Sequence, residues 1–379
     1  MSGAGNVNGD AYDDILVGAY NYKPADLLPD AGAVYMYYGG GNGPGSEANW
    51  QYESSQKEAY FGWSVGAAGD VNGDTFADII VGAPLYEAIA ATHLSEGAVF
   101  VFYGSANGLP DQPSWQAVGG ETGAQLGRSV SGAGDVNGDG VSDIIAGAPS
   151  YAGVGRAVVY HGQDGGDEGE EAGLGQTPAW QTLGPQADSW FGYAVAGAGD
   201  VNGDGFDDVI VSAPQISMTV GTESAKAAVY VYLGSEKGLS AEPANTIYHT
   251  QLYSRFEYRV AGAGDVNKDG YDDILVSARQ YDDDQPNAGA VFLYFGSPLG
   301  VSSQPDWQAF GDKADAELGW GLGGVGDINA DGYADIIAGA PYFKLDLKDP
   351  VGRAMAFFGA EGGGTGGVSL YLPLVVRKP

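Results

Sequence analysis

The chain has 379 residues, of which 65 are Gly and none is Cys. An interior Gly costs a helix about 1 kcal/mol relative to Ala, so this much glycine excludes a mainly helical protein. The missing cysteine excludes disulfides and thiolate metal sites. Acidic residues number 49 against 16 basic ones, which gives a formal net charge of −33. We therefore expect no nucleic-acid partner, because a phosphate backbone is bound by clustered Lys and Arg. We also expect no membrane insertion, because no apolar stretch is long enough to span a bilayer.

One nine-residue segment recurs six times at intervals of about 65 residues. We call these segments the Asp loops and number their places 1 to 9. They are Asn6–Asp14, Asp70–Asp78, Asp135–Asp143, Asp200–Asp208, Asp265–Asp273 and Asp327–Asp335. Other landmarks keep the same phase: a step such as Phe61-Gly62 precedes a loop, and a step such as Gly82-Ala83-Pro84 follows it. The chain is therefore an array of one repeated structural unit.

Each unit is predicted to hold four short strands and essentially no helix. In the second unit the predicted strands are Ser64–Gly69, Asp78–Gly82, Gly97–Gly104 and Ser114–Val118, separated by Gly, Pro and Asn. Four short strands cannot bury both faces of their sheet alone, but identical sheets stacked around an axis can. The small residues of the first strand, as at 129–134, suit the place where the sheets converge. The sequence therefore predicts an all-β fold, a β-propeller of four-stranded antiparallel blades.

The repeat phase predicts one propeller domain over residues 1–379. Its blades are expected at approximately 1–56, 57–121, 122–186, 187–251, 252–314 and 315–379, with Leu370–Val376 as the last outer strand. Six repeat units closing into a ring is one interpretation. The other is a seven-bladed parent whose first blade and secretion signal precede Met1, since the chain itself shows no signal peptide.

The Asp loops have the layout of a site for a hard cation. Places 1, 3, 5 and 9 carry side-chain oxygens and place 7 offers its backbone carbonyl, and calcium takes six to eight oxygen ligands. The candidate ligands are Asn6, Asn8, Asp10, Tyr12 and Asp14; Asp70, Asn72, Asp74, Phe76 and Asp78; Asp135, Asn137, Asp139, Val141 and Asp143; Asp200, Asn202, Asp204, Phe206 and Asp208; Asp265, Asn267, Asp269, Tyr271 and Asp273; and Asp327, Asn329, Asp331, Tyr333 and Asp335.

Two other interpretations of these loops were weighed. An EF-hand needs Glu at the twelfth place and flanking helices, but that place holds Val81, Ala146 or Val211 within predicted strands. Asp, Asn and Gly also make ordinary hairpin turns. A turn does not need a carboxylate at the ninth place in all six copies, so we expect up to six structural Ca²⁺ ions. The first site is expected to be the weakest, because Asn6 and Ala11 replace Asp and Gly.

These motifs closely resemble the FG-GAP repeat found in the propeller of integrin α subunits and related bacterial surface proteins. The resemblance implies calcium loops on one face, partner binding on the opposite face, secretion or surface display, and adhesion or recognition rather than catalysis. Two departures matter. Integrin propellers have seven blades of which only some carry calcium, whereas six units are visible here and all six have a loop.

The connections between second and third strands vary, and variable loops on a rigid scaffold are where binding usually occurs. They cover residues 20–30, 85–96, 150–153, 215–225, 280–288 and 342–350. In the fifth unit Arg255, Arg279, Tyr253 and Tyr281 are predicted to share one face as an anion or carbohydrate contact patch. The alternative is that Arg279 simply pairs with Asp282 or Asp283.

The sequence thus predicts an extracellular, calcium-binding adhesion or recognition module, expected to be a monomer that binds a protein or glycan. The alternatives are a lectin-like propeller or a structural spacer of a larger surface protein. A hydrolase is disfavoured because His93, His161 and His249 lie at unrelated phases of the repeat, without a nucleophile arrangement around them. No catalytic residue and no organic cofactor is expected.

Overall fold

The computed structural model describes residues 1–23, 29–88, 94–165, 172–216, 218–220, 223–225, 227–249, 256–344 and 351–360. Within these residues the sole helical element is one 3-10 turn, Tyr151–Gly153. No helix in this described part is long and apolar enough to cross a bilayer. The prediction of an all-β protein is confirmed.

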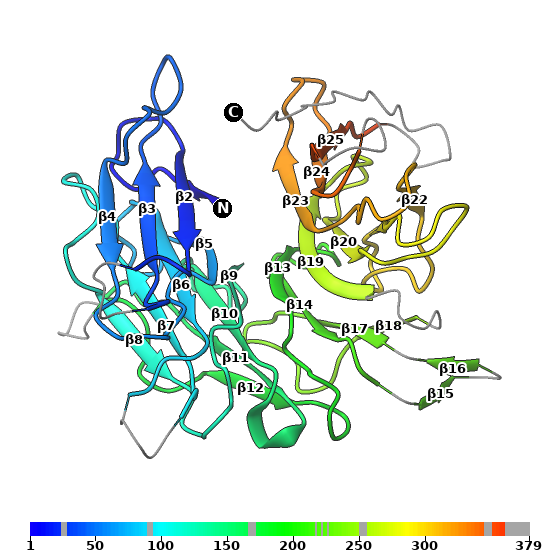
Figure 1. The fold of residues 1–379 in the computed structure, drawn as a ribbon, viewed down its shortest axis with the longest axis horizontal. Coiled ribbons are helices and arrows are strands. Elements are labelled where there is room, and N and C mark those ends of the chain that lie inside the picture. The colour runs from blue at the N-terminus through cyan, green and yellow to red at the C-terminus, as the bar shows by residue number, and fades with distance from the viewer. Residues whose placement is uncertain are drawn as a thin grey trace. The chain divides into compact units, whose positions relative to one another are not determined.

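The strands form one sheet for each repeat, and in each sheet they are hydrogen-bonded in chain order (Figure 1). The first three sheets are β1 (Ser2–Gly5), β2 (Asp14–Ala19), β3 (Ala33–Tyr37) and β4 (Trp50–Glu53); β5 (Ser64–Gly69), β6 (Asp78–Ala83), β7 (Ala98–Phe102) and β8 (Trp115–Val118); and β9 (Ser129–Gly134), β10 (Asp143–Ala148), β11 (Arg156–Tyr160) and β12 (Trp180–Leu183).

The last three sheets are β13 (Val195–Gly199), β14 (Asp208–Ala213), β17 (Ala227–Tyr232) and β18 (Asn245–His249); β19 (Phe256–Gly264), β20 (Asp273–Ala278), β21 (Ala290–Tyr294) and β22 (Trp307–Phe310); and β23 (Gly321–Gly326), β24 (Asp335–Ala340) and β25 (Arg353–Phe357). The predicted outer strand Leu370–Val376 lies outside the described residues. The pairings within these sheets are antiparallel, as in β6 with β5 and β7. This is the blade architecture of a β-propeller, as predicted.

A two-stranded hairpin that the sequence did not predict lies between β14 and β17. Its strands are β15 (Met218–Val220) and β16 (Glu223–Ala225), and they pair antiparallel.

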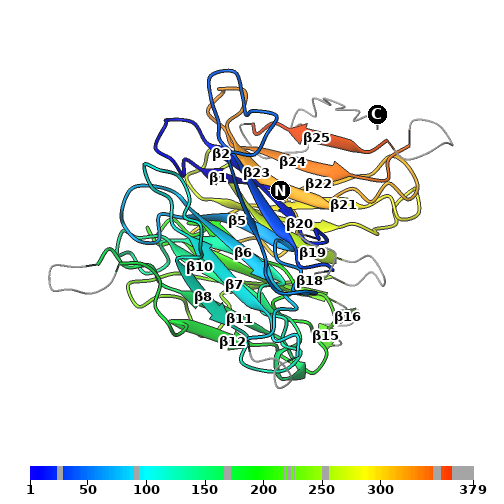
Figure 2. The same ribbon diagram turned by 60° about the vertical axis from the view of Figure 1, so that its left-hand side comes forward.

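The chain divides into two compact parts, residues 1–195 with 236–238, and residues 196–235 with 239–379. In the first part the innermost strands of successive sheets, β1, β5 and β9, are neighbours, and the sheets follow one another in chain order (Figure 2). A Cβ added at Gly132 in β9 would lie 3.0 Å from the carbonyl oxygen of Ala67 in β5. The small residues of the first strands therefore permit this close approach, as the sequence indicated.

The second part repeats this packing between β19 and β23. A Cβ added at Gly324 would lie 2.8 Å from the carbonyl oxygen of Gly262, so a larger residue would not fit there.

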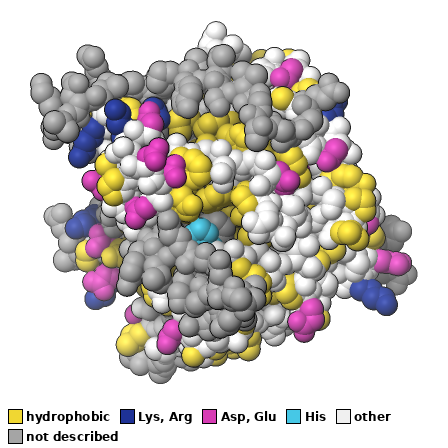
Figure 3. Space-filling model, turned by 90° about the vertical axis from the view of Figure 1, so that its right-hand side faces the viewer, with side chains coloured by type: hydrophobic (Ala, Val, Ile, Leu, Met, Phe, Trp, Pro, Cys, Tyr) yellow, Lys and Arg dark blue, Asp and Glu magenta, His cyan; other side chains and the backbone are white. Residues whose placement is uncertain are grey.

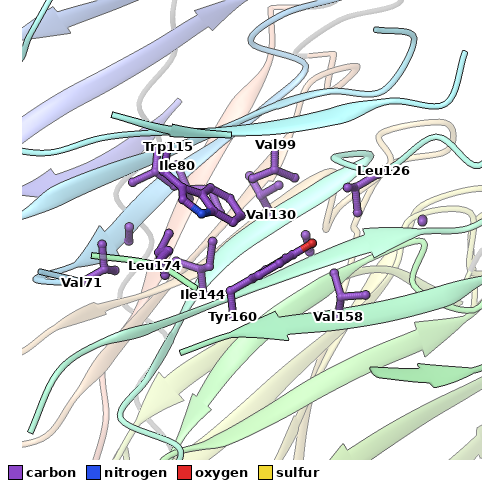
Figure 4. Close-up of a cluster of buried hydrophobic side chains, with 14 residues drawn as sticks. Val71, Ile80, Val99, Trp115, Leu126, Val130, Ile144, Val158, Tyr160 and Leu174 are labelled. Carbon is purple, nitrogen blue, oxygen red and sulfur yellow. The ribbon is translucent and has the colours of Figure 1, made fainter. Parts of the chain in front are cut away.

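The core lies between neighbouring sheets. The central strands β6 and β10 are buried at every residue, which agrees with their continuous apolar sequences. Figure 4 shows the cluster between the second and third sheets, where the Trp115 and Tyr160 rings meet edge to face at 4.7 Å. The Trp115 indole N–H also donates to the carbonyl of Gly175 at 3.2 Å. The tryptophan that closes one repeat thus anchors it to the next.

Candidate functional site

Each Asp loop joins the first strand of a sheet to the second. Place 2 anchors the loop in the core: Val71 and Val136 are fully buried, and only the equivalent Ile328 is exposed among the six described loops. Place 9 is the first residue of the second strand, as Asp143 is in β10. The loop is therefore fixed at both ends, with places 3 to 6 at the surface between them.

The side chain at place 1 organises the loop backbone. In the third loop the Asp135 carboxylate accepts the backbone N–H groups of Gly138 at 2.6 Å, Asp139 at 3.1 Å and Gly140 at 2.8 Å. In the first loop Asn6 accepts only from Gly9 and Asp10, at 2.7 and 3.2 Å. An amide has one accepting oxygen where a carboxylate has two. Asn6 therefore lacks the bond from the place-6 N–H that the second carboxylate oxygen accepts in the other five loops.

Places 3 and 5 form a second set of bonds that recurs in every Asp loop. In the third loop Asn137 Nδ2 donates to Asp139 Oδ2 at 2.8 Å, and Asn137 Oδ1 accepts the Asp139 N–H at 3.0 Å. Asp139 Oδ1 accepts the N–H of Val141 at 2.9 Å, so place 5 also fixes the residue whose carbonyl is the candidate ligand. These bonds bring the oxygens of places 1, 3 and 5 into one turn of chain.

Place 6 adopts a left-handed backbone conformation in the loops. Gly140 has φ +88°, which glycine adopts freely. Thr75 and Ala11, which replace this glycine in the second and first loops, have φ 76° and 73°. Residues with a Cβ are strained in this region, and a β-branched residue such as Thr is the most unusual there. The first two loops therefore carry a conformational cost that the third and fourth lack.

The carboxylate at place 9 is buried and has a structural role. Asp143 Oδ2 accepts the N–H of Val136 in its own loop, and Oδ1 accepts the N–H of Gly162 beyond the third strand, both at 2.9 Å. Burial raises the pKa of Asp143 to about 7, against the lowering effect of these two bonds and with a smaller raising effect from nearby carboxylates. The pKa values of Asp78, Asp208 and Asp273 are raised to about 7 for the same reason.

The two hydrogen bonds that the place-9 carboxylate accepts give a second explanation for its recurrence in the repeat. A carboxylate retained at place 9 in six copies was an argument for a metal ligand. Two backbone N–H groups that need an acceptor explain its presence equally well. The argument for a metal therefore depends on places 1, 3 and 5.

The Asp loops also join neighbouring sheets. The backbone carbonyl at place 1 accepts the N–H of place 8 in the following repeat, as in Ser142 to Asp70 at 2.9 Å and Ala334 to Asp265 at 3.1 Å. The carbonyl at place 2 accepts a second N–H from that repeat, as in Gln163 to Val71 at 3.2 Å. These loops are thus linked to the next sheet by backbone hydrogen bonds.

The donor set of the loops fits a hard cation. It contains only carboxylate, amide and carbonyl oxygens, which suit Ca²⁺ or Mg²⁺ rather than a soft metal. Each oxygen that accepts one N–H still has a second lone pair for an ion. Among the described residues, no three Asp, Glu or His side chains already converge as a metal cage. The side chains at places 1 and 5 would therefore have to turn toward an ion.

The predicted patch around Arg279 is not an open anion site. Arg279 is only 8% exposed, and its Nη1 donates to Glu317 Oε2 at 2.5 Å. Its guanidinium also lies over the Trp320 ring, 4.4 Å from the centroid. The acidic partner at this distance is Glu317, which directly precedes the Leu318-Gly319 step, and the sequence had offered Asp282 or Asp283 instead.

The other members of that predicted patch do not complete it. Tyr281 packs against Phe292 and Phe310, with ring centroids 5.6 Å away in each case. Tyr253 and Arg255 lie outside the described residues. Figure 3 shows one face of the molecule, on which described acidic side chains are scattered among apolar and uncharged ones.

The histidines lie in unrelated surroundings. His161 Nδ1 is 3.2 Å from Asn137 Nδ2 beside the third Asp loop, and burial lowers its pKa. His249 packs against Tyr281 and Phe292, and burial lowers its pKa to about 4. His93 lies outside the described residues.

Sequence reasoning missed the residues on either side of the Phe-Gly step. The backbone N–H of Trp63 donates to the carbonyl of Tyr60 at 3.0 Å, and Tyr193 donates to Trp190 in the same way, so each step forms a tight turn. We call these the Phe-Gly turns. The signal was present, because the flanking residues differ from repeat to repeat, while the step is Phe-Gly or Leu-Gly in the second, third, fourth and sixth repeats.

Comparison with known proteins agrees with this architecture. A sequence model of the FG-GAP repeat matches residues 61–102, 126–160, 191–232, 258–294 and 319–371, more than half of the chain. The chain therefore belongs to the FG-GAP repeat proteins. The first sheet, β1–β4, lies outside the matched segments, although its Asp loop and strand order follow the same pattern.

Among curated proteins, the chain is similar to integrin α subunits. It is 32% identical over 222 residues to integrin alpha-8 of Mus musculus and 32% identical over 221 residues to integrin alpha-V of Gallus gallus. These matches cover 57% of this chain and 19% and 20% of the relatives. Integrin alpha-5 of Xenopus laevis is 29% identical over 265 residues, 66% of this chain and 23% of the relative. The chain spans about a fifth of the length of these relatives.

Proposed function

We propose that this propeller is an extracellular recognition module whose Asp loops bind structural Ca²⁺. The observation that carries the proposal is the loop geometry, in which the same hydrogen bonds bring oxygens from places 1, 3 and 5 together at the surface in six loops. Bringing Asp135 and Asp139 into one turn, over the buried Asp143, costs electrostatic repulsion unless a cation offsets it.

The residues that would hold the ion are those at places 1, 3, 5 and 9, with the carbonyl at place 7. Bound calcium would neutralise these carboxylates and link the two ends of the loop. Since the first, second, fourth and fifth loops are hydrogen-bonded to the following sheet, an ion there would also stiffen the joint between those blades. Sites in extracellular modules have dissociation constants of about 10⁻⁴–10⁻³ M, which extracellular calcium would fill.

The recognition function is supported by family membership and by the similarity to integrin α subunits. The Asp loops follow the first strands, whereas the Phe-Gly turns precede them, so the two sets lie at opposite ends of those strands. We propose that the metal occupies one end and that a protein or glycan partner binds at the other. On this proposal the module is not catalytic.

The test is the number of calcium ions bound and their effect on stability. Equilibrium dialysis against ⁴⁵Ca²⁺ and thermal unfolding with calcium or chelator should show several bound ions and a higher melting temperature with calcium, because a ligand that binds only the folded state stabilises it.

Single variants sharpen this test. Asp139→Ala and Asp204→Ala should each remove about one ion, because place 5 contributes an exposed ligand. Asp188→Ala, an exposed acid outside the Asp loops, is the control for loss of charge. If the protein binds no calcium and melts identically in both buffers, the proposal is wrong.

A further inference from the structure

Three Phe-Gly turns in the first compact part bring aromatic and cationic side chains together. In each turn the residue before the step and the residue after it flank a tight bend, and the pairs are Tyr60 with Trp63, Gln125 with Arg128, and Trp190 with Tyr193. Tyr20, which follows β2, joins them, because its ring lies 4.7 Å from Trp63 and 5.9 Å from Tyr60. We call these seven residues the aromatic–arginine surface.

Arg128 lies between two rings of this surface. Its guanidinium carbon is 4.3 Å from the Trp63 ring centroid and 4.9 Å from that of Tyr193, and Nη2 donates to the Tyr193 hydroxyl at 3.0 Å. With both faces covered by rings, the guanidinium can pair with a carboxylate only through the N–H donors along its edge.

No carboxylate of the described residues forms an ion pair with Arg128. Arg279 and Arg353 are paired to acids, whereas Arg156, like Arg128, lies over an aromatic ring and donates to an uncharged acceptor. The arrangement holds a cation rigidly between aromatic rings and leaves its edge available. A ligand with a carboxylate would supply the missing partner.

The rings around Arg128 are partly open to solvent. Trp190 is 40% exposed and Tyr20 is 38% exposed. Trp190 and Tyr193 stack at an interplanar angle of 13° with centroids 5.9 Å apart, so Trp190 is held in place by its neighbour. Trp190 and Tyr60 also have a left-handed φ of 55°. Gln125, at the same place of the second turn, has φ 60°, so this conformation belongs to the turn itself.

The mixture of groups favours a sugar over a protein partner. Protein interfaces are depleted of Asp and Glu relative to the rest of the surface. Here two groups of rings, Trp63 with Tyr20 and Tyr193 with Trp190, meet at the charged Arg128. The exposed acids Glu58 and Asp188 lie two residues before Tyr60 and Trp190 in the same turns. A pyranose presents C–H groups on one face, which pack on aromatic rings, and hydroxyls at its rim, which these carboxylates, Gln125 and the tyrosine hydroxyls can bind.

We infer that the aromatic–arginine surface binds a glycan unit that carries a carboxylate, such as a uronic or sialic acid. Arg128 pairs with the carboxylate, and the sugar ring packs against Trp190, which stacks on one of the two rings that cover Arg128. This inference rests on the proposed recognition function and specifies the chemistry of the partner.

The experiment is isothermal titration calorimetry of the full chain with two matched pairs of probes. One pair is a hyaluronan hexasaccharide and its carboxyl-reduced form; the other is sialyllactose and lactose. We expect binding of at least one acidic probe, with its neutral counterpart at least about tenfold weaker. An acidic peptide is titrated in parallel and is expected not to bind.

Variants assign the binding to this surface. Arg128→Gln should weaken the acidic probe about tenfold and leave any neutral binding unchanged, and Trp190→Ala should weaken both. Leu183→Ala is the matched control, because Leu183 is 53% exposed in the same compact part and is not one of the seven residues of the aromatic–arginine surface. Trp190 is at the surface, so its variant reports on binding even if Arg128→Gln unfolds.

Absence of binding, equal binding of acidic and neutral probes, unchanged binding by both variants, or binding of the peptide instead of the sugars would overturn the inference. Calcium binding measured on the same samples separates this result from the proposed function. A chain that binds calcium but no acidic glycan refutes the inference alone.

Discussion

Replacing Thr75 by glycine is expected to stabilise the protein. Thr75 occupies place 6 of the second Asp loop with φ 76°, a conformation that a β-branched residue rarely adopts. Its side chain is exposed, so its removal leaves no cavity. Its backbone N–H donates to Asp70 Oδ2 at 2.7 Å, and glycine can make the same bond. The substitution therefore changes mainly the backbone strain.

The magnitude follows from two opposing effects. A left-handed conformation costs a residue with a Cβ about 1–2 kcal/mol. Glycine gives back about 0.4–1 kcal/mol, because it gains more freedom than threonine in the unfolded chain. We therefore expect Thr75→Gly to raise the free energy of unfolding by about 0.5–1 kcal/mol.

The third Asp loop offers the reverse substitution as a matched control. Gly140 occupies the same place with φ +88°, and a Cβ added there would meet no atom within 4 Å. Gly140→Thr therefore adds backbone strain without a steric clash. It should lower the free energy of unfolding by a similar amount, with Gly140→Ala as an intermediate case.

Urea denaturation in chelator, followed by tryptophan fluorescence, measures both changes without a contribution from metal. The strain argument requires shifts of opposite sign in the two loops. If Thr75→Gly destabilises the protein, or if Gly140→Thr leaves it unchanged, the left-handed conformation at place 6 does not carry the cost assigned to it.

Two further predictions concern buried ionisable groups. Glu317→Ala leaves the buried Arg279 without its carboxylate and should cost about 3 kcal/mol in urea denaturation; Asp315→Ala, an exposed acid nearby, should have little effect. For His249, burial lowers the folded pKa from 6.5 to about 4. As the pH falls below 6.5, the unfolded chain takes up a proton at His249 that the folded protein does not. The stabilising contribution of neutral His249 is therefore present above pH 6.5 and is lost as the pH falls toward 4. The free energy of unfolding is lower by about 2 kcal/mol at pH 5 for this reason. His249→Phe should lose less stability than the parent between pH 7 and pH 5, and an equal loss would contradict this assignment.

The strands and their order could be predicted from local sequence patterns. The continuous apolar residues of Ile79–Val81 predicted a strand buried on both faces, and β6 is buried throughout. The small residues at 129–134 predicted close contact between first strands, which Gly132 makes possible. These features are local, because strand periodicity and the left-handed glycines of a turn depend on neighbouring residues alone. Repetition in a constant phase then indicated the propeller.

Only the tertiary structure decided what the individual charged groups contact. The carboxylate of Asp143 accepts two N–H groups, one of them from Gly162 in a different segment, so its structural role could not be predicted from its own loop. Arg279 pairs with Glu317 at a distance of 38 residues, although two acids lie within four residues of it. Arg128 meets Trp63 and Tyr193 because each follows a Phe-Gly or Leu-Gly step in a different repeat. Such contacts depend on how the sheets pack, because a repeat of about 65 residues places equivalent positions of successive sheets side by side.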